Sequence, residues 1–363
     1  MLTKNKEVIE GWSGPGKKDE NIEPLLLSED VLHIDMNKHG NYEWWYFDAH
    51  LDNGYTVVVF FYAKNPNPGP GTQGKTGIEI VLLRPDGVRN QKFIRFKKSE
   101  FTASRTKPEV KIGTNTLKVN QQSNGLPIYE IDAKGEGLGC HLTYKTTVNG
   151  WKPGSGDSKF GDLGTFSWII PFARATVEGS IIDNEKTLEV TGIGYHDHNW
   201  LDFPFPQVIN YWMWGRIYSE NHTISYAFIQ CNNKVDNHQV KVLMVADHQE
   251  ITTSTGEFDF KQNNFNYNSI AKHRFPNEIT IKVENKISVI LKVKRILEAQ
   301  DMLQNFNPIF RFLAKAILKI KPGYFRLNSE FDLEIQKNGI IEKETGSTLH
   351  EIVIFKPIDE GSV

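Results

Sequence analysis

The residues best suited to chemistry lie together in one stretch, residues 192–200. This stretch reads Gly-Ile-Gly-Tyr-His-Asp-His-Asn-Trp, so a phenol, two imidazoles, a carboxylate, an amide and an indole occupy six consecutive positions. Titratable groups at this density are typical of catalytic sites, where neighbouring groups shift the pKa of an acid or a base. The stretch therefore predicts an active site centred on Asp197.

Glycines and prolines around this stretch predict that it is a short β-strand with an abrupt end. Two glycines allow a close approach to a neighbouring backbone, and two prolines soon afterwards stop regular pairing. Side chains alternate between the two faces of an extended strand. One face should carry the acid and its hydrogen-bonding neighbours, Tyr195, Asp197 and Asn199. The other face should carry the imidazoles and the indole, His196, His198 and Trp200.

An aromatic segment nearer the N-terminus predicts a second strand that bears a carboxylate. Residues 41–50 are dense in aromatic side chains, and an Asn-Gly pair separates them from the apolar run 55–63. Two such runs around Asn-Gly are typical of a β-hairpin. Because Glu43 is followed directly by three rings, we interpret it as a second candidate carboxylate and the rings as ligand-binding groups, Trp44, Trp45 and Tyr46.

Short apolar runs separated by turn residues continue along most of the chain. They indicate an all-β protein, a sandwich or a barrel, rather than alternating strands and helices. A second aromatic hairpin is predicted over residues 211–231, and it contains Trp212, Trp214 and Arg216. Because the two hairpins resemble each other and the chain has 363 residues, we predict two structurally related domains. Their ranges are 1–205, with an irregular leader at 1–40, and 206–363.

One long amphipathic helix is predicted in the second half of the chain. Asn307 can cap it, Pro308 suits its first turn, and the Pro-Gly pair at 322–323 ends it. Apolar residues recur at helical spacing over 308–320, and basic residues stand four apart on the opposite side. We expect this helix to pack on a β-barrel. The alternative is a peripheral membrane contact through 308–320.

The composition is that of a globular protein with an ordinary charge balance. The chain has 39% hydrophobic residues, 24% charged residues and a net charge of −2, so nothing favours binding to nucleic acid. It contains neither a secretory signal nor a run of about 20 apolar residues. The two cysteines have no ligand-like spacing. We expect a cytoplasmic protein, and the alternative is one that associates with a membrane through the predicted helix.

The motifs Glu-Trp-Trp-Tyr-Phe at 43–47 and Tyr-His-Asp-His-Asn-Trp at 195–200 resemble signatures of a known family. From about residue 30 onwards, the chain is similar to the carotenoid 1,2-hydratase (hydroxyneurosporene synthase) and AttH-like family. The resemblance implies two lipocalin-like β-barrel domains with a ligand cavity. It also implies hydration of an isolated alkene of an acyclic isoprenoid, or cyclisation, including intramolecular 4+2 cycloaddition. Leu201 stands where the family pattern has glycine, which affects the expected substrate shape more than the chemistry.

Hydration of an unactivated alkene begins with protonation of carbon, so it requires a carboxylic acid that stays protonated near neutral pH. Burial among aromatic groups raises a carboxyl pKa in that direction, and Asp197 is our first choice for this acid. Tyr195 and Asn199 would orient the acid or a water, and Glu43 is the second candidate. A guanidinium beside the acid, such as that of Arg216, would lower its pKa and abolish the role.

The two histidines and the aromatic residues complete the predicted site. One of His196 and His198 would act as a base or position the acid, and the other would be structural. Two imidazoles seldom hold a metal without further ligands, so we predict neither a metal nor another cofactor. Aromatic faces would stabilise a carbocation. The predicted substrate-binding residues are Trp44, Trp45, Tyr46, Asn199, Trp200, Trp212, Trp214 and Arg216.

Three functions follow from these observations, and each has a hydrophobic small molecule as its partner. The leading one is a cofactor-independent enzyme for acid-assisted hydration or isomerisation of a carbon–carbon double bond in a polyene or isoprenoid. The second is a natural-product cyclase acting on a polyketide or terpenoid, where the cavity restricts the substrate's conformations. The third is a non-catalytic lipocalin-like carrier.

Overall fold

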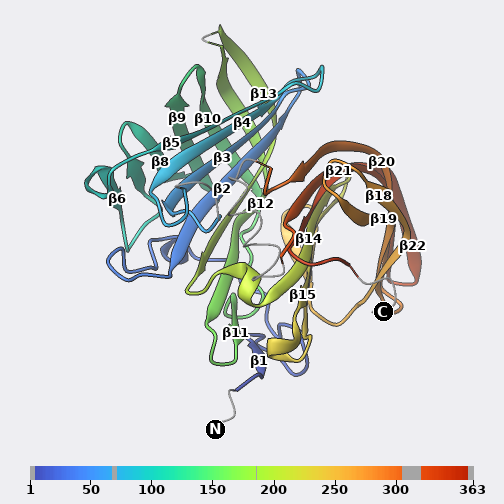
Figure 1. The fold of residues 1–363 in the computed structure, drawn as a ribbon. Coiled ribbons are helices and arrows are strands. Elements are labelled where there is room, and N and C mark those ends of the chain that lie inside the picture. The colour runs from blue at the N-terminus through green and yellow to red at the C-terminus, as the bar shows by residue number, and fades with distance from the viewer. Residues whose placement is uncertain (1–4, 68–71, 185, 305–319, 359–363) are drawn as a thin grey trace.

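The fold, seen in a computed structural model, consists of two curled antiparallel β-sheets that lie side by side (Figure 1). The structure describes residues 5–67, 72–184, 186–304 and 320–358. Within these ranges the regular elements are strands and four short 3-10 helices, which confirms the predicted all-β class. The helix predicted at 308–320 falls almost wholly on residues outside this part of the chain. No described helix is long and apolar enough to cross a membrane.

The first sheet contains all the strands up to residue 201. Its main path runs β5-β4-β3-β2-β13-β12-β10-β9-β8-β7-β6, and β11 joins β12 to the short β1. The strands are β1 (Val8–Glu10), β2 (Tyr42–Leu51), β3 (Thr56–Lys64), β4 (Gly77–Leu83), β5 (Arg89–Arg95), β6 (Phe101–Ala103), β7 (Val110–Ile112), β8 (Asn115–Gln121), β9 (Pro127–Gly135), β10 (Leu138–Val148), β11 (Asp157–Phe160), β12 (Thr165–Asp183) and β13 (Lys186–Leu201).

The second sheet contains the remaining strands in the order β17-β16-β15-β14-β22-β21-β20-β19-β18. These are β14 (Ile209–Tyr218), β15 (His222–Cys231), β16 (Gln239–Asp247), β17 (Glu250–Thr255), β18 (Asp259–Asn268), β19 (His273–Val283), β20 (Ile287–Asp301), β21 (Gly323–Lys337) and β22 (Ile340–Ile354). The 3-10 helices are η1 (Leu27–Glu29), η2 (Lys98–Glu100), η3 (Phe205–Gln207) and η4 (Asn233–Val235).

Both sheets follow the same connection rule. In each, a long strand early in the sheet pairs with the last strand, β2 with β13 and β14 with β22. In each, the two edge strands are consecutive in sequence, β5 and β6 in the first sheet and β17 and β18 in the second. The edge strands are not paired with each other, so each sheet is curled but open. This shared order agrees with the expected relation between two halves and is consistent with a lipocalin-like fold. The domain boundary at 205/206 stays a prediction.

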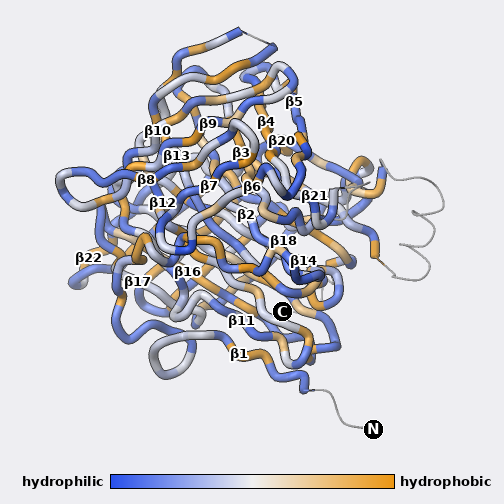
Figure 2. Tube along the Cα trace, turned by 90° about the vertical axis from the view of Figure 1, so that its left-hand side faces the viewer, coloured by the Kyte–Doolittle hydropathy of each residue, from blue (hydrophilic) through white to orange (hydrophobic). Residues whose placement is uncertain are grey.

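The two hairpins predicted around aromatic segments are confirmed. Strands β2 and β3 flank the Asn-Gly turn, and β14 and β15 pair from Ile209 to Cys231. The predicted stop after the histidine-rich strand is also confirmed, because β13 ends at Leu201 and η3 begins at Phe205. Polar and apolar positions are interleaved along the chain (Figure 2), as expected when strands bury one face.

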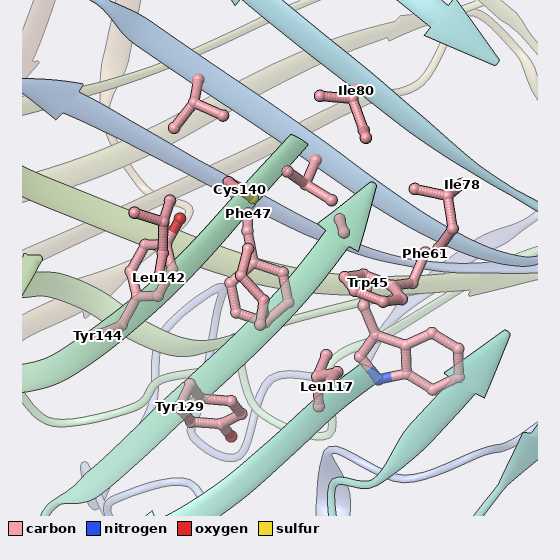
Figure 3. Packing of buried hydrophobic residues seen from close by; sticks show 14 of the residues in the cluster. Trp45, Phe47, Phe61, Ile78, Ile80, Leu117, Tyr129, Cys140, Leu142 and Tyr144 are labelled. Carbon is pink, nitrogen blue, oxygen red and sulfur yellow. The ribbon is translucent and has the colours of Figure 1, made fainter. Parts of the chain in front are cut away.

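A compact apolar core fills the curl of the first sheet. Side chains from β2, β3, β4, β8, β9 and β10 converge there (Figure 3). Trp45, Phe47, Phe61, Tyr129 and Tyr144 are among its largest fully buried members. A second cluster of buried side chains draws on both sheets, since it contains Trp44 and Tyr46 as well as Val353 and Phe355. Strand β2 therefore supplies one face to the first core and the other to the space between the sheets.

Candidate active site

A cavity of about 330 Å³ lies between the two sheets. Strands β2, β3, β4 and β13 provide one wall, and β14, β15, β16, β20, β21 and β22 provide much of the other. Its lining is largely aromatic and aliphatic, with a few polar groups, as is typical of small-molecule sites. The predicted ligand-binding residues that line it are Trp44, Tyr46, Asn199, Trp212 and Trp214.

Asp197 of β13 lines this cavity and is 8% exposed. Three side chains donate hydrogen bonds to its carboxyl group. Tyr195 Oη and Trp168 Nε1 lie 3.0 and 3.2 Å from Oδ2, and Asn199 Nδ2 lies 2.8 Å from Oδ1. All three donors are neutral, and none of the hydrogen-bond partners of Asp197 in the described structure is a cation. The predicted face with Tyr195, Asp197 and Asn199 therefore exists.

The environment of Asp197 makes it a weaker acid than an ordinary aspartate. Burial raises the pKa of its carboxyl group to about 6, although hydrogen bonds from Trp168, Tyr195 and Asn199 and the nearby His196 lower it in part. Burial disfavours the charged form because water no longer solvates it. A protonated carboxyl group is therefore populated at Asp197 just below neutral pH.

Gly194 explains how β13 reaches this position. A Cβ atom at Gly194 would lie 2.5 Å from the Tyr144 ring, a distance that atoms in contact do not reach. Since Tyr144 is fully buried in the first core, the ring cannot move aside easily. The glycine thus lets the strand pack closely on the core just before its polar residues begin, as the sequence predicted.

The opposite face of β13 carries the two histidines in a fully buried network. Asp30 lies between them, with Oδ2 3.1 Å from His196 Nε2 and Oδ1 2.9 Å from His198 Nδ1. The other ring nitrogen of His198 lies 2.9 Å from Glu43 Oε1, and Tyr129 Oη donates to Asp30 Oδ2 at 2.8 Å. The side chains of the two histidines and of both carboxylates are 0% exposed. Two carboxyl groups and two imidazoles therefore contact one another inside the first sheet.

This network shifts pKa values in the direction opposite to that of Asp197. Burial alone would lower the pKa of His198, but its contacts with Asp30 and Glu43 raise it to about 9. Burial alone would raise the pKa of Asp30, but His196 and His198 hold it well below its usual range. His198 is therefore protonated and Asp30 ionised at neutral pH, and the two form a buried ion pair.

Glu43 and the two histidines do not line the cavity, although the sequence predicted catalytic roles for them. Glu43 instead accepts hydrogen bonds from the backbone nitrogens of His33 and Ile34, both at 2.9 Å. It thus joins β2 to the leader. Strands β13 and β2 hold these three side chains on the faces turned away from the cavity, so their catalytic roles stay predictions.

Arg216 is paired with Asp48, and its hydrogen bonds among the described residues involve neither Asp197 nor Glu43. Its Nη1 lies 2.7 Å from Asp48 Oδ2 and its Nη2 lies 2.5 Å from Oδ1. The guanidinium also stands 4.9 Å from the centre of the Tyr195 ring. Since Arg216 comes from the second sheet and Asp48 from the first, this ion pair joins the sheets. It leaves the carboxyl group of Asp197 without a guanidinium.

Two predicted ligand-binding rings lie away from the cavity. Trp45 stacks on His198 at 4.3 Å and Trp200 stacks on His33 at 3.6 Å, so both pack around the buried network. Arg216 does not line the cavity either. The alternation of side chains accounts for these placements, because Trp45 and Trp200 share faces with Glu43 and His198.

Several residues of the cavity and of the buried network were not predicted from the sequence. Trp168 of β12 binds Asp197, and Glu79 of β4 lines the same cavity. Asp30 comes from the leader, which was expected to be an irregular cover. The leader also reaches the second sheet, where Lys18 pairs with Thr255. The sequence pattern could have indicated Glu79, because it is a single acidic residue in an otherwise apolar strand that contains Ile78, Ile80 and Val81. Such a residue is typical of a polar group that faces a cavity.

Comparison with known proteins places the chain in a family. Residues 31–307 match the model of a family described as AttH-like, which is well over half of the chain. The chain belongs to the AttH-like family. The match includes both aromatic motifs and confirms the resemblance that they suggested.

Two curated relatives and one solved structure are similar to this chain. A hydroxyneurosporene dehydrogenase of Chlorobaculum tepidum is 23% identical over 281 residues, 69% of this chain and 70% of the relative. The quinolone epoxide rearrangement protein penF of Penicillium thymicola is 25% identical over 198 residues, 47% of this chain, and the match spans only 51% of penF. Kievitone hydratase from Nectria haematococca is 16% identical, with a TM-score of 0.58 over 97% of this chain and 99% of the hydratase. This structural likeness shows a shared fold.

Proposed function

We propose that this AttH-like protein is an enzyme that protonates a carbon–carbon double bond of a hydrophobic small molecule, with Asp197 as the acid. The observation that carries the proposal is the setting of Asp197, which faces an aromatic cavity and is held by neutral donors. The names of the relatives support the reaction class, because they include a hydratase and a rearrangement protein. Hydration and isomerisation share this first step.

The step begins with transfer of the Asp197 proton to one alkene carbon, which leaves a carboxylate and a carbocation at the other carbon. The rings of Trp44, Tyr46, Trp212 and Trp214 line the cavity and can stabilise the cation with their electron-rich faces. In hydration, a water adds to the cation and the released proton returns to the carboxylate. In isomerisation, loss of a neighbouring proton to the carboxylate forms a shifted double bond.

The hydrogen-bond pattern indicates which oxygen carries the proton. Oδ2 accepts from both Trp168 and Tyr195, which occupies its two lone pairs. Among the described residues, Asn199 is the one donor to Oδ1. The acidic proton therefore belongs on Oδ1, and a reacting double bond would lie beside that oxygen.

Substitution of Asp197 by Asn tests this proposal. The wild-type and variant proteins are expressed in a host that makes an acyclic carotenoid, and extracts are examined by mass spectrometry for a gain of one water. Isomers are separated by chromatography. We expect turnover to fall at least 100-fold in Asp197→Asn, because the acid is lost, with ligand binding retained as measured by tryptophan fluorescence. Asp132→Asn, on the exposed face of β9, is the control that should keep full activity.

Two other outcomes distinguish the alternative functions. Full turnover by Asp197→Asn to a product of unchanged mass would contradict the acid role and favour cyclisation by cavity shape. Recovery of tightly bound but unmodified ligand with every substrate tried would favour a carrier. For the acid mechanism, activity should fall about tenfold per pH unit above pH 6, because only the protonated form of Asp197 reacts.

A further inference from the structure

The cavity contains a second unusual carboxyl group, that of Glu79 on β4. Tyr62 Oη donates a hydrogen bond to Glu79 Oε2 at 2.9 Å, and Gln91 Nε2 donates to Oε1. Both donors are neutral, as at Asp197. Burial raises the pKa of the Glu79 carboxyl group, and hydrogen bonds from Gln91 and Tyr62 only partly offset this. A carboxylate has about four acceptor sites, so two remain for a ligand.

The other charged groups that line the cavity neutralise each other. Arg89 Nε lies 3.0 Å from Glu298 Oε2, and Arg326 Nη2 lies 2.5 Å from Glu351 Oε1. Each of the two arginines thus has its own glutamate. Among the described residues that line the cavity, Glu79 and Asp197 are the carboxyl groups that form no salt bridge with an arginine, although the nearby charge of Arg89 lowers the pKa of Glu79 in part. Glu79 is partly buried, and a partly buried carboxyl group without a salt-bridge partner favours a ligand that donates a hydrogen bond or carries a positive charge.

Strand register places these two carboxyl groups at opposite ends of one row. Asp197 pairs with Tyr46 of β2, Tyr46 pairs with Phe60 of β3, and Phe60 pairs with Glu79 of β4. All four side chains line the cavity. Three strand spacings of roughly 4.8 Å separate the ends of the row, so Asp197 and Glu79 lie about 14 Å apart along the sheet.

The floor between the two ends is aromatic. The Tyr46 and Phe60 rings meet edge to face with centres 5.0 Å apart, and the Phe60 ring stacks on Tyr62 at 5.2 Å. An elongated apolar chain lying on these rings would meet one acid at each end. The two ends would then contact different parts of the same molecule.

From this row we propose that Glu79 forms a head-group subsite for a hydroxyl or protonated amine at one end of an elongated apolar substrate, whose reactive bond lies about 14 Å away at Asp197. The substrate class is therefore an amphipathic chain with a hydrogen-bond donor at its terminus. This inference rests on the proposed function for the role of the Asp197 end. The Glu79 end can be tested by binding alone.

Binding of four twelve-carbon probes tests the subsite at pH 7.5. Dodecylamine, dodecanol, dodecane and dodecanoate are measured by displacement of the neutral reporter N-phenyl-1-naphthylamine from the full chain. We expect dodecylamine to bind at least tenfold more tightly than dodecane, dodecanol to lie between them, and dodecanoate to bind most weakly. Equal affinity for all four probes, or a preference for dodecanoate, would overturn the proposal.

Two matched variants locate the preference. Glu79→Gln should remove the preference for dodecylamine over dodecane, while Asp197→Asn should keep it. The reverse pattern would assign the head group to Asp197 and overturn the proposal. If Glu79→Gln does not fold, Tyr62→Phe, which removes a donor to Glu79, should reduce binding of dodecanol relative to dodecane at least threefold; no change would count against the subsite.

These measurements separate failure of the subsite from failure of the proposed function. A retained amine preference together with an active Asp197→Asn enzyme would contradict only the acid mechanism. Loss of turnover in Asp197→Asn without any probe preference would contradict only the head-group subsite.

Discussion

On one face of β13 the acid Asp197 meets only neutral donors, whereas on the other face two histidines meet the carboxylates of Asp30 and Glu43. Both faces are buried, so bulk water solvates both of them poorly. Without a counter-charge, burial raises the pKa of Asp197 to about 6. With paired acids, the pKa of His198 rises to about 9 and that of Asp30 falls. The presence or absence of an opposite charge thus decides whether a buried group keeps or loses its charge.

This difference separates a structural face from a reactive one. A paired network is stable and holds the leader against β2 and β13, because Asp30 and Glu43 reach across segments distant in sequence. An unpaired acid that stays close to its titration point can exchange a proton with a ligand. Burial of this unpaired acid lowers the free energy of unfolding.

The largest expected effect comes from breaking the paired face. Asp30→Asn removes the carboxylate between His196 and His198 and should lower the free energy of unfolding by about 3 to 5 kcal/mol, because buried charges lose their partner. Chemical denaturation at pH 6 measures this loss. Asp132→Asn, which removes an exposed carboxylate 3.6 Å from His141, is the control with a much smaller effect. An Asp30→Asn protein as stable as wild type would contradict the paired network.

The free energy of unfolding of the wild-type protein should depend on pH in a way that reflects the same network. Because the folded pKa of His198 is about 9 and the ordinary pKa of histidine is 6.5, the stability that His198 contributes is fully present below about pH 6.5 and is lost as pH rises through 9. The lowered pKa of Asp30 adds stability above its ordinary value of 3.8, which is lost as pH falls through the folded pKa.

The next largest effect has the opposite sign and comes from the unpaired face. The pKa of Asp197 is raised from 3.8 to about 6, so the folded state binds the extra proton and stability falls as pH rises through this interval. Asp197→Asn avoids this loss and should gain about 2 to 3 kcal/mol relative to wild type between pH 4 and pH 7.5. Thermal unfolding at both pH values measures the gain.

The control for this gain in stability is a substitution of a buried acid that forms an ion pair. Asp48→Asn breaks the buried pair with Arg216 and should destabilise the protein at pH 7.5. Destabilisation of Asp197→Asn to a similar extent at neutral pH would show that Asp197 is an ordinary paired carboxylate and would remove the contrast between the faces.

The smallest expected effect comes from removing a single neutral hydrogen-bond donor to Asp197. Trp168→Phe deletes the hydrogen bond from Nε1 to Asp197 Oδ2, which favours the ionised acid, and should raise the pKa of Asp197 by about one unit. Carbon-13 NMR titration of labelled aspartate measures the shift. Trp214→Phe is the matched control, since its Nε1 has no hydrogen-bond partner among the described residues. Equal shifts in the two variants would assign the effect to ring volume.

Local sequence patterns determined the strands and their faces. Alternation over 195–200 separated Asp197 from the histidines correctly, and the aromatic hairpins at β2–β3 and β14–β15 were placed correctly. These features depend on neighbours within one strand or one turn, where the period of two and the Asn-Gly turn apply directly.

Only the tertiary structure decided which face met the cavity and which charges paired. Asp30 lies 166 positions from His196, and Arg216 lies 168 positions from Asp48, so no local pattern links them. The sequence showed that a carboxylate shares a strand face with a phenol and an amide. It could not show that the second sheet would close over that face while the leader closed over the other, because burial and counter-charge arise from segments that meet only on folding.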